Sequence, residues 1–187
     1  MRRLLVIALL GIGLNAFSQD YPDPDFLDEV CHLQQGDSVR IIRLEKAHSR
    51  MDTRMKAAGI GRAESGYMID GEKSSVRVTD GEKLSFVYAT SGAGMMDVSN
   101  MIALYKADVG RGMRKVLLHK GGGYFGGKLR SSEKYSFSVR QIREGYWELV
   151  VDKPLPEGEY AFTSVPYGTG AMDGSITLFA FGVDRKN

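Results

Sequence analysis

The chain has 187 residues, a formal net charge of +2 and one cysteine. Its 25 basic and 23 acidic residues nearly balance, so composition gives no electrostatic argument for binding nucleic acid or an anionic membrane surface. One cysteine excludes an internal disulfide. The stability of the fold must therefore come from core packing.

The start of the chain has the layout of a secretory signal peptide cleaved after Ser18. Arg2 and Arg3 precede the apolar stretch 4–14, and Ala16 and Ser18 put small residues at the −3 and −1 positions. About 11 apolar residues are too few to span a bilayer, which requires about 20. We therefore expect an exported protein, periplasmic or extracellular, with no membrane span after cleavage.

Cleavage would remove residues 1–18 of the 187 and leave 169, a length that suits one domain. Arg2 and Arg3 would leave with the signal peptide, which takes the formal charge from +2 to zero. Within the mature chain we expect a lead-in and hairpin over 19–45 and a main β domain over 66–187. Residues 27–45 should belong to the same domain as 66–187.

The first predicted hairpin joins Glu29–Gln34 to Ser38–Glu45 through the turn at 35–37. The segment 46–65 that follows is polar and basic and has no apolar stripe. It is predicted to be a crossing loop or linker.

Asp70-Gly71-Glu72-Lys73 recurs ten residues later as Asp80-Gly81-Glu82-Lys83, between runs of alternating side chains. Asp-Gly tolerates the positive φ angles of tight turns, so both copies predict hairpins.

The second half of the chain continues the β pattern. Two further hairpins are predicted, followed by two last strands; the segments are 101–109 with 113–120, 135–142 with 146–152, and then 158–165 and 176–184. Short strands at roughly ten-residue spacing indicate an all-β fold, an antiparallel β-sandwich of the immunoglobulin-like or Greek-key type.

A tyrosine corner supports the sandwich. Leu155, Gly158 and Tyr160 fall close to the pattern L-x-P-G-x-Y, in which the tyrosine hydroxyl bonds back to nearby backbone. The proline, Pro156, lies one residue further from the glycine than the pattern requires. Trp147 alternates with Glu148 on a predicted strand and is assigned to the core.

The sequence resembles a group of exported bacterial β-sandwich proteins of unknown function. The resemblance lies in "ESGYMIDGEKSSVRV" (64–78), "NMIALYKADVGRGMRKV" (100–116), the glycine-rich loop, "PLPEGEYAF" (154–162) and "LFAFGVD" (178–184). It implies a secreted β-sandwich and carries over no catalytic residue.

The glycine-rich segment "KGGGYFGGKLR" (120–130) contains G-x-G-x-x-G and G-x-x-x-x-G-K. A phosphate-binding loop also needs a Ser or Thr after the lysine and a helix that follows, but Leu129 and a predicted strand stand there. We expect a hairpin tip instead. Tyr124 and Phe125 at this tip are expected to fold back onto the sheet; the alternative is that they are exposed and, with Lys128, form the candidate contact for a glycan or protein partner.

The sequence was also searched for metal-binding and catalytic motifs. His48, Met51 and Met55 form a candidate Cu(I) site, because thioether and imidazole ligands suit that ion. No zinc spacing and no G-x-S-x-G motif occur. We expect a non-catalytic structural or interaction module of the cell envelope without a cofactor, and keep a carbohydrate- or peptide-binding module and a periplasmic copper-binding protein as alternatives.

Overall fold

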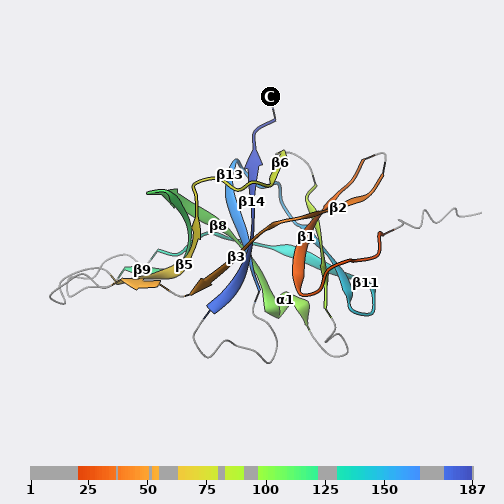
Figure 1. Ribbon diagram of the computed structural model, residues 1–187, viewed down its shortest axis with the longest axis horizontal. Helices are drawn as coiled ribbons and strands as arrows, with labels where there is room; N and C mark the ends of the chain where they lie inside the picture. The colour runs from red at the N-terminus through yellow and green to blue at the C-terminus, as the bar shows by residue number, and fades with distance from the viewer. Residues whose placement is uncertain are drawn as a thin grey trace, which may run out of the picture.

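The computed structural model describes residues 21–36, 38–50, 52–54, 63–79, 83–90, 97–121, 130–164 and 175–186 (Figure 1). Regular structure in these ranges is almost entirely antiparallel β, in two sheets, with one short helix, α1 (Val98–Met101). The predicted all-β class is confirmed. The predicted signal peptide, 1–18, lies outside the described residues.

The small sheet has five antiparallel strands in the order β11-β12-β7-β1-β2. Both hairpins predicted for its outer strands, β1–β2 and β11–β12, are present. The strands are β1 (Glu29–Gln34), β2 (Arg40–Arg43), β7 (Ser85–Ala89), β11 (Phe137–Arg143) and β12 (Tyr146–Val151).

The large sheet follows the order β3-β14-β13-β8-β9-β5-β4, with β6 beside β14 and β10 beside β8. Strand β6 pairs in parallel, and the other pairs are antiparallel. The strands are β3 (Glu45–Arg50), β4 (Asp52–Arg54), β5 (Ala63–Asp70), β6 (Arg77–Thr79), β8 (Ile102–Gly110), β9 (Met113–Gly121), β10 (Lys134–Tyr135), β13 (Gly158–Ser164) and β14 (Ser175–Asp184).

The two sheets share one apolar core. Phe86 of β7 packs edge-on against Phe162 of β13 at 4.8 Å between ring centroids, and at 5.0 Å from the ring of Phe181. Trp147 lies in the same cluster, so its predicted place in the core is confirmed, and Tyr160 lies there too. The Tyr160 hydroxyl donates a 2.6 Å hydrogen bond to the carbonyl of Pro156, the bond expected of a tyrosine corner.

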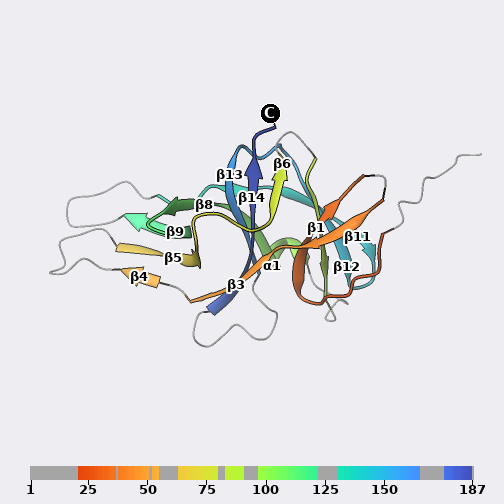
Figure 2. The same cartoon turned by 45° about the horizontal axis from the view of Figure 1, so that its top comes forward.

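The large sheet curls so that its outlying strands approach each other (Figure 2). The amide of Met68 on β5 donates to Ser49 Oγ on β3 at 2.8 Å, although four strands separate β3 from β5 in the sheet order. A second apolar cluster fills the inside of the curl, with Ala107, Ala161 and Ala180 among its members. Small side chains there let the strands close on one another.

Two sequence expectations about this sheet are wrong. The segment 46–65 is not a loop throughout, because β3, β4 and the start of β5 run through its described residues. The turn at Gly71 (φ +79°) does not close a hairpin: β5 pairs with β4 and β9, whereas β6 pairs with β14. The second Asp-Gly copy, 80–82, lies outside the described residues.

The lead-in before β1 crosses the outer face of the small sheet. Phe26 is buried in a third apolar cluster with Cys31, Val87 and Tyr146. The carbonyl of Pro22 accepts a hydrogen bond from the Tyr146 hydroxyl at 3.3 Å. Residues 21–28 therefore form a strap that covers apolar side chains of this sheet.

Candidate functional site

An open hollow of about 370 Å³ lies at one end of the curled sheet. Five strands and α1 contribute to it, and Lys134 of β10 stands beside them. The lining residues are Tyr67, Ser99, Asn100, Met101, Ile102, Ala103, Tyr105, Leu118, Lys134, Thr163 and Ile176. A hollow of this volume lies within the range of sites that bind small ligands.

The alternation of side chains along each strand explains why these residues meet. On β8, Ala103, Tyr105 and Ala107 point into the curl, whereas Ile102 and Leu104 pack in the core between the sheets. On β13, Thr163 lies above Ala161 in the same way. The apolar cluster inside the curl therefore forms the floor of the hollow.

Gly66 sets the position of the neighbouring Tyr67. The pairing of β5 with β9 shifts between Ser65 and Gly66, and a Cβ at Gly66 would stand 2.4 Å from the carbonyl oxygen of Val116. Only glycine permits this close approach of two strands. The Tyr67 side chain that follows is 8% exposed and lines the hollow.

Tyr67 and Lys134 bring polar groups to this apolar surface. Burial raises the pKa of Tyr67, so the hydroxyl stays protonated and can donate a hydrogen bond at neutral pH. Lys134 pairs with Tyr105 across β10 and β8, which puts the two side chains on the same face. The arrangement combines aromatic rings, aliphatic side chains, hydroxyl groups and one ammonium group.

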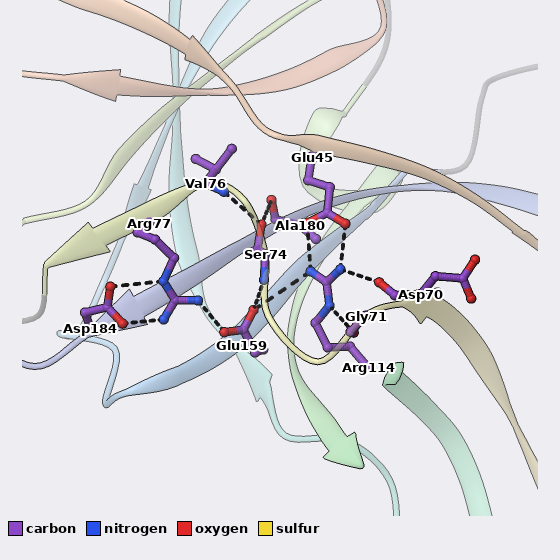
Figure 3. Close-up of polar contacts among 10 residues, drawn as sticks. All are labelled: Glu45, Asp70, Gly71, Ser74, Val76, Arg77, Arg114, Glu159, Ala180 and Asp184. Carbon is purple, nitrogen blue, oxygen red and sulfur yellow. Dashed lines mark hydrogen bonds and ion pairs between the residues drawn. The ribbon is translucent and has the colours of Figure 1, made fainter. Parts of the chain in front are cut away.

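The other end of the curl is filled by charged side chains (Figure 3). Arg114 is 1% exposed and donates to both carboxylate oxygens of Glu45, at 2.9 and 2.5 Å. It also donates to the carbonyls of Asp70 and Gly71, at 2.8 and 3.0 Å. Its Nη1 lies 3.8 Å from Oε2 of Glu159.

Glu159 links Arg114 to a second arginine. Arg77 donates to Glu159 and to Asp184, and Ser74 donates its amide to Glu159 Oε2 at 2.8 Å. Gly182 leaves the space for this arginine, since a Cβ there would overlap the Arg77 guanidinium. We call Glu45, Arg77, Arg114, Glu159 and Asp184 the ion-pair plug.

Hydrogen bonds stabilise the charged forms in the plug. Burial opposes ionisation of Glu45, but bonds from Arg114 and Ser74 outweigh it and hold the pKa of Glu45 below its usual value. A hydrogen bond to Asp184 raises the pKa of Arg77 further above its usual range. Within the described part of the chain, every buried side-chain nitrogen or oxygen has a hydrogen-bond partner. We therefore assign the plug to stability rather than to chemistry.

A third polar cluster ties the strap to the small sheet. Glu148 is buried and accepts from Ser85 at 2.6 Å, from Tyr21 at 3.0 Å and from two nitrogens of Arg140 at 3.0 and 2.5 Å. Burial works against ionisation, but these bonds hold the pKa of Glu148 below its usual value.

The structure describes few of the residues predicted to bind. Tyr124, Phe125, Lys128, Met51 and Met55 all lie outside the described residues, so their predicted roles stay predictions. His48 is described: it is exposed on β3, and its Nδ1 lies 3.3 Å from Thr177 Oγ1. In the ranges that the structure describes, no three His, Cys, Asp or Glu side chains are grouped to hold a metal ion.

Two further residues that the sequence analysis used, Gly158 and the single cysteine, are among the described residues. Gly158 has φ +155° at the start of β13, two residues before the corner tyrosine. Cys31, the single cysteine, is wholly buried on β1. Burial, and then the charge of Glu29, raise the pKa of its thiol to about 12.

Sequence reasoning missed Tyr67, Tyr105 and Lys134 as site residues. Both tyrosines were counted only as members of strands. The signal in the sequence is an aromatic residue in the middle of each strand, and which face of the sheet it lies on has meaning only once the strand order is known.

Fold and site together define an all-β protein of two antiparallel sheets with an open hollow at one end of the larger sheet. In the described part of the chain, no helix has both the length and the apolarity needed to cross a membrane. The chain matches no protein-family model, no curated protein and no solved structure.

Proposed function

We propose that the protein is a non-catalytic, exported binding module of the bacterial cell envelope, and that the open hollow is its ligand site. The observation that carries the proposal is the asymmetry of the curled sheet. One end is filled by paired charges, and the other presents Tyr67, Tyr105 and Thr163 around an unfilled volume of about 370 Å³. Export rests on the signal-peptide layout of residues 1–18.

The fold that goes with this function is an antiparallel β-sandwich of the immunoglobulin-like or Greek-key type. The core between the sheets favours it, since Phe86 and Leu149 of the small sheet belong to the same cluster as Phe162 and Phe181 of the large sheet. Strand β7 pairs with β12 and β1, which are distant in sequence, and such neighbours are typical of Greek-key connections.

The glycine-rich segment follows β9 in the sequence. Leu118 of β9 lines the hollow, the strand ends at Gly121, and Tyr124 follows three residues later in the sequence. The contact predicted for Tyr124, Phe125 and Lys128 with a glycan or protein partner therefore stays a separate prediction of the sequence.

The proposal is tested by an NMR titration of the ¹⁵N-labelled protein with three probes: maltotriose, trialanine and octanoate. We expect at least one probe to shift amide resonances of 100–105, Thr163 and Ile176 in a saturable way. Ala103→Trp should abolish the shifts by filling the hollow, and Val109→Trp, at an exposed position of the same strand, should not. The absence of saturable shifts for all three probes at millimolar concentration would overturn the proposal.

A further inference from the structure

The described residues around the hollow carry charge of one sign only, which is positive. Among the described lining residues, Lys134 carries the one formally charged side chain, and none of these residues is an aspartate or glutamate. Lys134 forms no ion pair with any other residue that the structure describes, whereas Arg130 nearby pairs with Asp108 at 3.0 Å. An anionic group of a ligand would therefore meet an ammonium group that is free to pair.

Tyr67 adds a hydrogen-bond donor. The residue is 8% exposed, and its hydroxyl makes no hydrogen bond to another described residue, so the hydroxyl oxygen is not one of the fully buried polar atoms, all of which are partnered. By contrast, Thr163 Oγ1 in the same lining already donates to the carbonyl of Ala103 at 3.3 Å. A phenol hydroxyl that bonds to no other described residue is available to donate to a ligand oxygen.

The remainder of the lining is apolar. Leu118 is 38% exposed, unusual for a large aliphatic side chain on a strand otherwise rich in buried residues. Ile176 and the ring of Tyr105 are half-buried beside the buried Ile102. A ligand that covers these side chains removes apolar surface from water, which favours binding by about 25 cal/mol per Å² before the costs of association.

We infer that the hollow binds a small amphipathic carboxylate. In this arrangement the carboxylate pairs with Lys134 and accepts the Tyr67 hydroxyl, while an aliphatic body covers Leu118, Ile176 and the Tyr105 ring. The inference rests on the proposed function and specifies its ligand: a neutral sugar would leave the ammonium unpaired, and a cation would be repelled by it.

Two probes that differ in charge but not in chain length test the inference. Octanoate and octan-1-ol are titrated separately into the ¹⁵N-labelled protein, and the dissociation constant of each is taken from the shifts of 100–105. We expect octanoate to bind about fivefold or more tightly than octan-1-ol, in line with a partly exposed ion pair. The preference should shrink in 0.5 M NaCl because salt screens the pair.

Single substitutions distinguish the contact of the carboxylate with Lys134 from its contact with Tyr67. Lys134→Gln should weaken octanoate about three- to fivefold and leave octan-1-ol unchanged, while Lys153→Gln, an exposed lysine outside the lining, should change neither. Tyr67→Phe should weaken octanoate by about three- to tenfold, by removing the donor while keeping the ring.

The outcomes distinguish this inference from the proposed function. Equal binding of octanoate and octan-1-ol, or an unchanged octanoate affinity in Lys134→Gln, would overturn the carboxylate assignment and leave the ligand site intact. Saturable binding of maltotriose with none of octanoate would do the same. If no probe binds, both the site and its ligand class are wrong.

Discussion

At the scale of single residues, the fold depends on charges that are buried but fully paired. Arg114 occupies an inward position of β9 and bonds to a carboxylate and to two backbone carbonyls. Paired charges of this kind add little net stability relative to apolar replacements, but removal of one partner leaves the others uncompensated. Replacement of Arg114, the least exposed residue of the plug, should therefore destabilise the fold most.

Replacement of that member gives the first prediction. Arg114→Met should lower the free energy of unfolding by about 3–5 kcal/mol, because Glu45 loses its arginine partner and Glu159 keeps only Arg77 and the Ser74 amide. The measurement is urea denaturation at neutral pH. Arg130→Met, which breaks an exposed ion pair with Asp108, should change stability by at most about 1 kcal/mol. Equal effects for the two variants would contradict the role assigned to the plug.

Glu148 gives a pH-dependent prediction. Its folded pKa lies below that of a free glutamate, about 4.3, so its contribution to stability is complete above that pH. The contribution is lost as the pH falls through the lower folded value. Glu148→Gln should therefore destabilise the protein at pH 6, and the gap to the wild type should narrow as the pH falls below about 4.3.

Urea midpoints at pH 6, 4 and 3 measure this gap. Glu144→Gln, at an exposed carboxylate in the β11–β12 turn, is the matched control and should follow the wild-type curve. A gap for Glu148→Gln that stays constant from pH 6 to pH 3 would show that ionisation of this carboxylate does not stabilise the fold.

At the scale of elements, the strap over 21–28 completes the small sheet. Asp23 pairs with Arg143 at 2.5 Å, Asp25 lies 3.4 Å from Arg43, and Phe26 enters the apolar cluster on the outer face. The acidic residues are exposed, so the ion pairs contribute little and the aromatic ring contributes most. The strap therefore acts mainly as a hydrophobic cover for one face of a sheet.

Two adjacent residues of the strap test this view. Phe26 is 6% exposed and Leu27 is 61% exposed. Phe26→Ala should lower the free energy of unfolding by about 3 kcal/mol or more, whereas Leu27→Ala should be nearly neutral. Denaturation of both variants measures the contrast. A small loss for Phe26→Ala would mean that the strap does not cover the sheet in solution.

The elements were partly predictable from the sequence. The turns at 35–37, 110–112 and 143–145 close hairpins between neighbouring strands, and local turn chemistry was sufficient to find them. The hairpin predicted at Asp70-Gly71 is absent, because β6 after this turn pairs with β14 rather than with β5. Ser74 and Arg77 both donate to Glu159, which lies more than 80 residues away.

At the scale of the whole molecule, the site was not predictable from local patterns. Tyr67, Tyr105, Leu118, Thr163 and Ile176 come from five strands spread over 110 positions of the sequence, and they meet only because the large sheet curls. Alternation along one strand predicts two faces, but it does not predict that both faces of β8, β13 and β14 are covered.

The same curl connects the stability of the fold with the proposed ligand site. Its closed end holds strands from distant parts of the chain together through ion pairs, while its open end presents the hollow. A loss of the plug should therefore disturb the ligand site even though Arg114 does not line it.

Intermolecular nuclear Overhauser effects in the octanoate complex test the central claim most directly. We predict contacts from the aliphatic chain of octanoate to the methyl groups of Leu118 and Ile176 and to the rings of Tyr67 and Tyr105, with none to Leu27 or Val109. Contacts confined to any other face of the protein would contradict the assignment of the hollow as the binding site.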